Sequence, residues 1–282
     1  MNFKFLYTMI AIAAFALQPV FAQSLKTPAP SPNQTLKQSF ALSEISIEYS
    51  RPSAKGRVVF GDLVPFGKMW RTGANSASKI TVTETVMIEG NKMEPGTYAI
   101  YTIPNKDNWE VLFYKDLKLG GSVNDYNKEN ELFRCTVKTS KLTDKVETFT
   151  INLNDISPNA CKLEFTWENT KVALNVTADI ETAIMKNIET VMNTDSKPYY
   201  QAANYYFENN KDGKKALEWA TLATAQNPKA YWVMLLKAKI EAKNGDKKAA
   251  EVSANKVKEL ATEAKNNDYV VMADKLIADL KK

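Results

Sequence analysis

The chain has 282 residues, of which 44% are hydrophobic and 24% charged, and its formal net charge is +5 at pH 7. This composition is typical of a soluble globular protein with room for two domains. The positive charge comes from many lysines matched by 32 acidic residues. We therefore expect a solvated surface and no nucleic-acid partner, since a nucleic-acid-binding face would need clustered basic residues.

The chain contains no histidine. This excludes Ser-His and Cys-His nucleophile pairs and the commonest protein ligand of zinc and copper. The sequence also lacks a calcium loop of the D-x-D-x-D-G type and the usual serine nucleophile motifs. We expect no metal and no cofactor. Any hydrolysis would depend on paired carboxylates, and no pair of acids is singled out.

The N-terminus has the pattern of a secretory signal peptide. Lys4 provides positive charge, and the apolar run Leu6–Leu17 is too short to span a membrane. Val20-Phe21-Ala22 then offers a cleavage site, and no cysteine follows it to carry a lipid anchor. We predict that residues 1–22 are removed and that the protein is periplasmic or secreted, with no membrane span after cleavage.

Residues 23–36 are rich in Pro, Ser, Thr and Gln, and we expect them to form a flexible linker. From residue 37 to residue 178 apolar and polar side chains alternate with period two, as in Ile45, Ile47 and Tyr49. Eight or nine short strands with turn signals between them predict an antiparallel β-sandwich or barrel.

Two details of this β region are specific. Residues 80–88 predict one strand, and Glu84 interrupts its inward-facing row, so this acid would need a partner. Farther along, residues 168–170 predict a turn that joins a strand over 161–167 to a strand over 172–176.

After Ala178 the apolar period changes to 3.6, which predicts helices over residues 179–282. Lys214-Lys215-Ala216 recurs as Lys247-Lys248-Ala249, and each copy follows a Gly/Asp turn. Helix pairs with a period near 34 residues are typical of tetratricopeptide repeats, although the usual Trp-Leu-Gly opening is missing here. We expect most aromatic side chains of this region to form its core and the rest to line a surface for a protein or peptide partner.

Arginine is concentrated in one stretch of the chain. Arg51, Arg57 and Arg71 are three of the four arginines, and the helical region uses lysine throughout. Arginine is needed where a planar fork must grip a carboxylate or stack on an aromatic ring, so these three side chains should have a geometric task.

Two interpretations of that task are open. In the structural one, Arg71 pairs with Glu84 or Glu48 and stacks on Trp70, which locks a loop onto the sheet. In the functional one, the stretch forms a cleft for an anionic or glycan ligand. The candidate ligand-binding residues are Arg51, Lys55, Arg57, Trp70, Arg71, Asn75 and Glu84.

Cys135 and Cys161 both fall on apolar phases of predicted strands. In an exported protein they are either a disulfide or two small buried side chains. A reactive thiol is not expected, because we expect no local positive or histidine environment that would activate one.

Several motifs of the β region resemble an exported bacterial domain of unknown function, family 2911, found in Bacteroidetes-type bacteria. The resemblance rests on residues 51–57, 60–67 and 70–75, and later on 95–98 and 109–113. It covers roughly residues 37–177 and implies a β-rich exported domain, sometimes followed by helical repeats. It implies no activity and no catalytic residue.

We expect a non-enzymatic binding protein, whose helical repeats dock a protein or peptide and whose β region binds an anionic or glycan ligand or the same partner. Two alternatives are a histidine-free, carboxylate-dependent hydrolase of envelope polysaccharide and a structural envelope protein.

Overall fold

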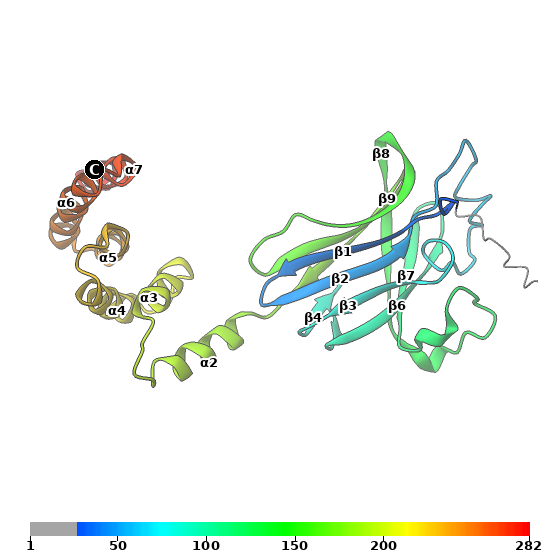
Figure 1. Ribbon diagram of the computed structural model, residues 1–282, viewed down its shortest axis with the longest axis horizontal. Coiled ribbons are helices and arrows are strands. Elements are labelled where there is room, and N and C mark those ends of the chain that lie inside the picture. The colour runs from blue at the N-terminus through cyan, green and yellow to red at the C-terminus, as the bar shows by residue number, and fades with distance from the viewer. Residues whose placement is uncertain (1–26) are drawn as a thin grey trace, which may run out of the picture. The chain divides into compact units, whose positions relative to one another are not determined.

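The computed structural model describes residues 27–282, which divide into two compact units between Ala178 and Asp179 (Figure 1). The first unit is built of strands and the second of helices, so the predicted order of a β region followed by a helical array is confirmed. The predicted signal peptide lies outside the described residues. In the described part, no helix has both the length and the apolar character needed to cross a lipid bilayer.

Within residues 27–178, nine strands form one sheet, and all of its pairings are antiparallel. They are β1 (Asn33–Phe40), β2 (Ser43–Ser50), β3 (Ser78–Val82), β4 (Val86–Ile88), β5 (Asn91–Met93), β6 (Gly96–Pro104), β7 (Asn108–Tyr114), β8 (Glu131–Asn154) and β9 (Ala160–Thr177). Their order across the sheet is β1-β2-β3-β6-β7-β8-β9-β4-β5. Two 3-10 turns, η1 (Leu117–Leu119) and η2 (Lys128–Asn130), lie between β7 and β8.

The sheet curls around its main core, and the end of β2 meets the last third of β8. Ile45, Ile47 and Tyr49 of β2 are buried as the alternation predicts. The Tyr49 hydroxyl accepts a hydrogen bond from the backbone N–H of Ile151 at 3.0 Å and donates to the Ile151 carbonyl at 3.1 Å. One side chain thus satisfies both backbone groups of a residue on a distant strand, which closes the sheet at this point.

Three local predictions for the β unit are wrong. Residues 33–36 are not linker but the start of β1, where they pair with β2. Glu84 does not interrupt a strand, because β3 ends before it and the residue lies exposed in the bend that leads to β4. The turn expected at residues 168–170 is absent, since β9 runs through it. Glu168 has a φ of 49° and lies where the register between β8 and β9 shifts. The residues that predict a turn therefore form an irregularity within β9.

Six helices follow within residues 179–282. They are α2 (Glu181–Val191), α3 (Tyr199–Glu208), α4 (Gly213–Gln226), α5 (Tyr231–Lys243), α6 (Lys247–Glu263) and α7 (Asn267–Leu280). From α3 onward each helix packs on the next, and α5 also contacts both α3 and α7. Alanines on the contacting faces, among them Ala220 and Ala254, are fully buried and let the helices approach closely.

The repeated Lys-Lys-Ala segments begin equivalent helices. Asp212 caps α4 by accepting hydrogen bonds from the N–H groups of Lys214 and Lys215 at 2.8 and 3.1 Å. Asp246, 34 positions later, caps α6 by accepting from the N–H of Ala249 at 2.9 Å. These carboxylates satisfy N–H groups that the first turn of a helix leaves without partners.

The two cysteines are not bonded to each other. Cys135 of β8 and Cys161 of β9 are both buried with free thiols, so of the two alternatives the structure has the pair of small buried side chains. Burial raises the pKa of each thiol to about 11.

We predict that both thiols resist alkylation in the folded protein. With pKa values of about 11, only about one thiol in a thousand is ionised near pH 8, and the thiolate is the reactive form. Iodoacetamide labelling followed by mass spectrometry should be slow in native buffer and complete at both cysteines in guanidinium chloride. Unlabelled cysteines after denaturation without reductant would indicate a disulfide and contradict the structure.

A second prediction concerns the two helix caps. Replacing Asp212 or Asp246 with alanine should lower the stability of the helical unit by about 1 kcal/mol each, because N–H groups at the start of the helix lose their acceptor. Urea unfolding followed by far-UV circular dichroism measures the effect. Glu251→Ala, an exposed change within α6, is the matched control. Equal midpoints for Asp246→Ala and this control would show that the cap contributes nothing.

Candidate ligand-binding cleft

The arginine-rich stretch forms the long loop 51–77 that joins β2 to β3, and backbone hydrogen bonds hold it against two other strands. Near its end, Trp70 and Thr102 of β6 exchange both backbone hydrogen bonds, at 2.7 and 2.9 Å. Near its start, Ala54 N–H donates to the Glu147 carbonyl and Phe149 N–H to the Pro52 carbonyl, at 2.8 and 2.9 Å. The loop is therefore an ordered part of the β unit at both ends.

The chain makes a tight passage directly after Trp70 and Arg71. Thr72 is fully buried with a φ of 56°, and its carbonyl accepts a hydrogen bond from the Ser78 hydroxyl. Gly73 has a φ of 152°, and a Cβ atom there would lie 2.9 Å from the carbonyl oxygen of Ser50. Glycine is required by this close approach of two backbones.

Trp70 anchors the loop on an aromatic cluster. Its ring stacks on Trp167 at 5.8 Å between centroids with an interplanar angle of 22°, and it packs against Phe149 at 5.0 Å. Its indole N–H donates to the Gly73 carbonyl at 2.9 Å. Trp167 is almost fully buried, whereas Trp70 is half-buried. Trp70 therefore keeps part of its ring exposed, and Trp167 forms a rigid floor beneath it.

Arg51 supports the structure of the β unit. Its guanidinium donates three hydrogen bonds, to the Phe149 carbonyl at 3.1 Å, the Gln34 side chain at 2.7 Å and the Thr150 hydroxyl at 2.7 Å. These acceptors belong to β1 and β8, so Arg51 joins both strands to the end of β2. The structural interpretation therefore fits this arginine.

Arg57 and Arg71 are held by fewer contacts. Arg57 donates to the carbonyls of Ala54 and Ser53, at 2.9 and 2.7 Å, and is exposed. Arg71 donates from one terminal nitrogen to the Asn75 carbonyl at 2.9 Å and is half-buried. Carbonyl acceptors orient a guanidinium but do not neutralise its charge.

The expected pairing of Arg71 with Glu84 or Glu48 is wrong. Within residues 27–282, Arg134 forms ion pairs, with Glu110 and Glu131, whereas Arg51, Arg57 and Arg71 form none. Trp70 stacks on Trp167 instead of on Arg71. Three guanidiniums of one loop therefore keep neutral partners, in a chain that elsewhere gives its arginine two carboxylates.

Arg57, Trp70, Arg71 and Asn75 line one open cavity of about 340 Å³, which we call the arginine cleft. Its wall also includes residues that the sequence analysis did not select: Ser31, Pro52, Leu63, Val64, Gly73, Ala74 and Trp167. No carboxylate is among the described residues that line it. The cleft thus combines two cations, one amide and two indoles with an aliphatic wall.

The other three candidate residues lie outside the arginine cleft. Arg51 is engaged between strands, as described above. Lys55 is exposed at a φ of 52°, where its backbone N–H donates to a carboxylate oxygen of Glu147 at 2.6 Å. Glu84 lies in the bend between β3 and β4. No group of three His, Cys, Asp or Glu side chains in residues 27–282 is placed to hold a metal ion.

Trp167 is the missed residue with most influence on the cleft. It ends the strand predicted over residues 161–167, and it is 1% exposed. Only the packing of Trp70 onto it shows that the core also forms the floor of a cavity. No spacing rule in the sequence would have revealed this, because loop 51–77 and β9 are about a hundred residues apart.

Comparison with known proteins agrees with these motifs. No curated protein and no solved structure matches the chain. Residues 31–176, which include all of the sheet except the last residue of β9 and all of loop 51–77, match a family described as a protein of unknown function, DUF2911. The chain therefore belongs to the DUF2911 family.

Proposed function

We propose that the arginine cleft binds a ligand that carries a carboxylate. This ligand is either an anionic glycan or a peptide. The observation that carries this proposal is the lining of the cleft, where Arg57 and Arg71 face a cavity beside Trp70 with no acidic side chain among the described residues. A cavity lined in this way has a positive potential, and low-dielectric walls strengthen that potential.

The donors of Arg71 support binding over a purely structural role. Its hydrogen bond to the Asn75 carbonyl uses one terminal nitrogen, so the guanidinium has further N–H groups for an acceptor on a ligand. A carboxylate that accepts two of these N–H groups in parallel is held by charge attraction and in a defined orientation. A lysine ammonium could not orient it in the same way.

The aromatic floor suggests what accompanies the carboxylate. The half-buried face of Trp70 and the side chains of Leu63 and Val64 offer apolar contact to a sugar ring or a peptide side chain. The volume of about 340 Å³ lies at the lower end of the range for ligand pockets, roughly 300–1,000 Å³. We infer that one sugar unit or one to two peptide residues occupy it.

Binding is favoured over hydrolysis at this cleft. Glycoside hydrolysis uses two carboxylates on either side of the scissile bond, and the described lining contains none. The carboxylate-dependent hydrolase considered from the sequence therefore finds no support at this site.

We further propose that the protein is exported to the periplasm or secreted, and that its helices form a tetratricopeptide-like array which docks a protein or peptide. The signal-like segment 1–22 supports export. Two helix hairpins whose second helices are capped by Asp212 and Asp246, 34 positions apart, support the array.

We predict that Arg71→Ala weakens carboxylate binding at least about tenfold, and that Arg71→Lys restores only part of it. Suitable probes for calorimetry are trigalacturonate and its neutral methyl ester, together with a tripeptide with a free or an amidated C-terminus. The wild-type protein should bind at least one acid more tightly than its neutral match.

Variants of the neighbouring arginines separate binding from folding. Arg57→Ala should weaken binding of the same ligand. It should not change the thermal stability of the protein, because the Arg57 side chain is exposed. Arg51→Ala should lower stability, since three hydrogen bonds between strands are lost. Binding that survives Arg57→Ala and Arg71→Ala together, in folded protein, would overturn the proposal.

A further inference from the structure

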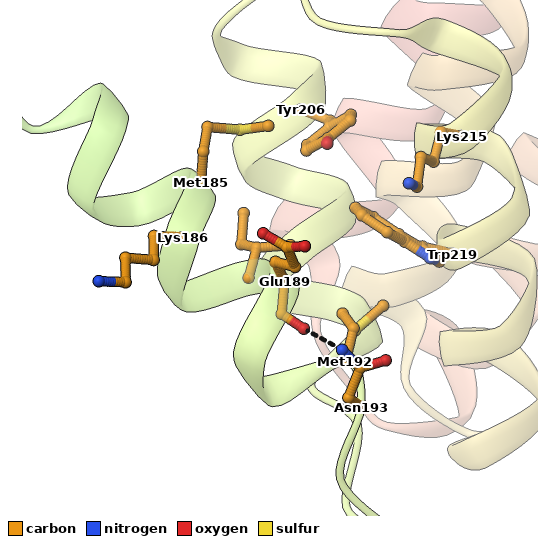
Figure 2. Close-up of a pocket in the computed structure, with 9 residues that line it drawn as sticks. Met185, Lys186, Glu189, Met192, Asn193, Tyr206, Lys215 and Trp219 are labelled. Carbon is orange, nitrogen blue, oxygen red and sulfur yellow. Dashed lines mark hydrogen bonds between the residues drawn. The ribbon is translucent and has the colours of Figure 1, made fainter.

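The helical unit contains a groove of its own, on the side where α2 lies against α3 and α4. Met185 and Ile188 of α2, with Met192 directly after the helix, form one wall. Tyr206 of α3 and Trp219 of α4 form the floor (Figure 2). We call this the α2–α4 groove; its volume is about 540 Å³. Tyr206 and Trp219 pack edge to face with centroids 4.8 Å apart, so the floor is rigid, while methionines adapt to different occupants.

Charged side chains stand on both sides of the α2–α4 groove. Glu189 comes from α2 and Lys215 from α4, with Lys186 at the outer edge (Figure 2). None of the three forms an ion pair within residues 27–282, and the Lys215 ammonium lies 5.1 Å from the centroid of Trp219. The groove therefore combines an apolar floor with two cations and one anion.

The helix α7 presents a matching surface. The side of α7 that carries Tyr269 and Ala273 packs on α5 and α6. The opposite side carries, at intervals of one turn, Asp268, the pair Val271 and Met272, and Lys275. We call these four residues the α7 face. Val271 and Met272 are 58% and 47% exposed, so the α7 face carries an apolar pair on its surface.

The charges on the α7 face are complementary to those of the groove. Asp268 and Lys275 form no ion pair within the described residues, and they flank the apolar pair one turn away on each side. In the groove, Lys186 and Lys215 are available to Asp268, and Glu189 is available to Lys275. An amphipathic helix that places an apolar pair in a groove is a common mode of protein recognition.

We propose that the α7 face of one copy of this chain docks into the α2–α4 groove of a second copy. Val271 and Met272 lie on the floor formed by Tyr206 and Trp219, while Asp268 and Lys275 reach the opposite charges at the rim. The proposal is independent of the ligand of the arginine cleft, which lies in the other unit.

This contact is heterologous, because it joins two different surfaces. Each copy keeps one unused groove and one unused α7 face, so association continues head to tail into chains unless the geometry closes a ring. The contact is small, and we therefore expect association that depends on protein concentration and weakens as salt screens the charges at the rim.

Sedimentation velocity of the purified full chain over a range of concentrations tests the proposal. The wild-type protein should form oligomers as concentration rises. Val271→Asp, which blocks the α7 face, and Met185→Asp, which blocks the groove, should each weaken self-association at least about tenfold, since a carboxylate would be buried at the contact. Val252→Asp on α6 is the matched control, because it changes an equally apolar, 72% exposed side chain outside both surfaces.

Mixing the two blocked variants gives the decisive result. Val271→Asp retains an intact groove and Met185→Asp an intact α7 face, so the mixture should form dimers that cannot grow further. Circular dichroism must show both variants folded, and Glu189→Lys, an exposed change, is an alternative block of the groove. A wild-type chain that remains a monomer at all concentrations, or a mixture that forms no dimer, would overturn the proposal.

Discussion

The β unit depends on the way Trp70 connects the long loop 51–77 to the core. Its backbone pairs with Thr102 of β6 as a strand residue would, and its ring lies on Trp167 and Phe149. The buried turn at Thr72 and Gly73 follows immediately. If the indole were lost, the loop would keep only the aromatic contacts of Phe60 with Trp109 and Trp167, and Arg57 and Arg71 would no longer be held beside a rigid floor. The geometry of the cleft is thus a consequence of core packing.

The arginines of loop 51–77 carry positive charge that no carboxylate of the described residues neutralises. Arg51, Arg57 and Arg71 all donate to neutral oxygens, and two of them face the same cavity. Like charges that share a site repel one another, so a protein would gain stability by adding an acid to it. The described residues of the cleft provide no such acid. Retention of an electrostatically unfavourable site is understandable if a ligand supplies the missing carboxylate, since groups arranged for binding are often kept at a cost in stability.

Much of the fold could be predicted from the sequence because it rests on periodicity. The alternation of Ile45, Ile47 and Tyr49 and the change of period after Ala178 both reflect local burial, which the chain records directly. The errors arose where tertiary pairing decides. Glu168 sits in a turn-like sequence, yet β8 supplies partners on both sides of it and keeps β9 as one strand. Similarly, Glu84 fits a strand pattern, but β3 ends before it and β4 begins after it.

The candidate site was predictable in part, for the same reason. The concentration of arginine near Trp70 marked the correct loop, because residue choice records chemistry even where structure is unknown. Which arginine would face a cavity was not predictable, since Arg51 and Arg71 differ only in what the fold places beside them. The floor residue Trp167 and the α2–α4 groove depend on contacts between distant segments, which composition and spacing do not reveal.

The most direct test of a carboxylate site in the arginine cleft is nuclear magnetic resonance of the arginine side-chain Nε–Hε groups during titration with trigalacturonate. The chain has only four arginines, so each signal can be assigned by substitution. Our account predicts that the signals of Arg57 and Arg71 shift with ligand, whereas those of Arg51, held between strands, and Arg134, paired with Glu110 and Glu131, do not. Equal shifts at all four arginines, or a shift at Arg134 alone, would contradict it.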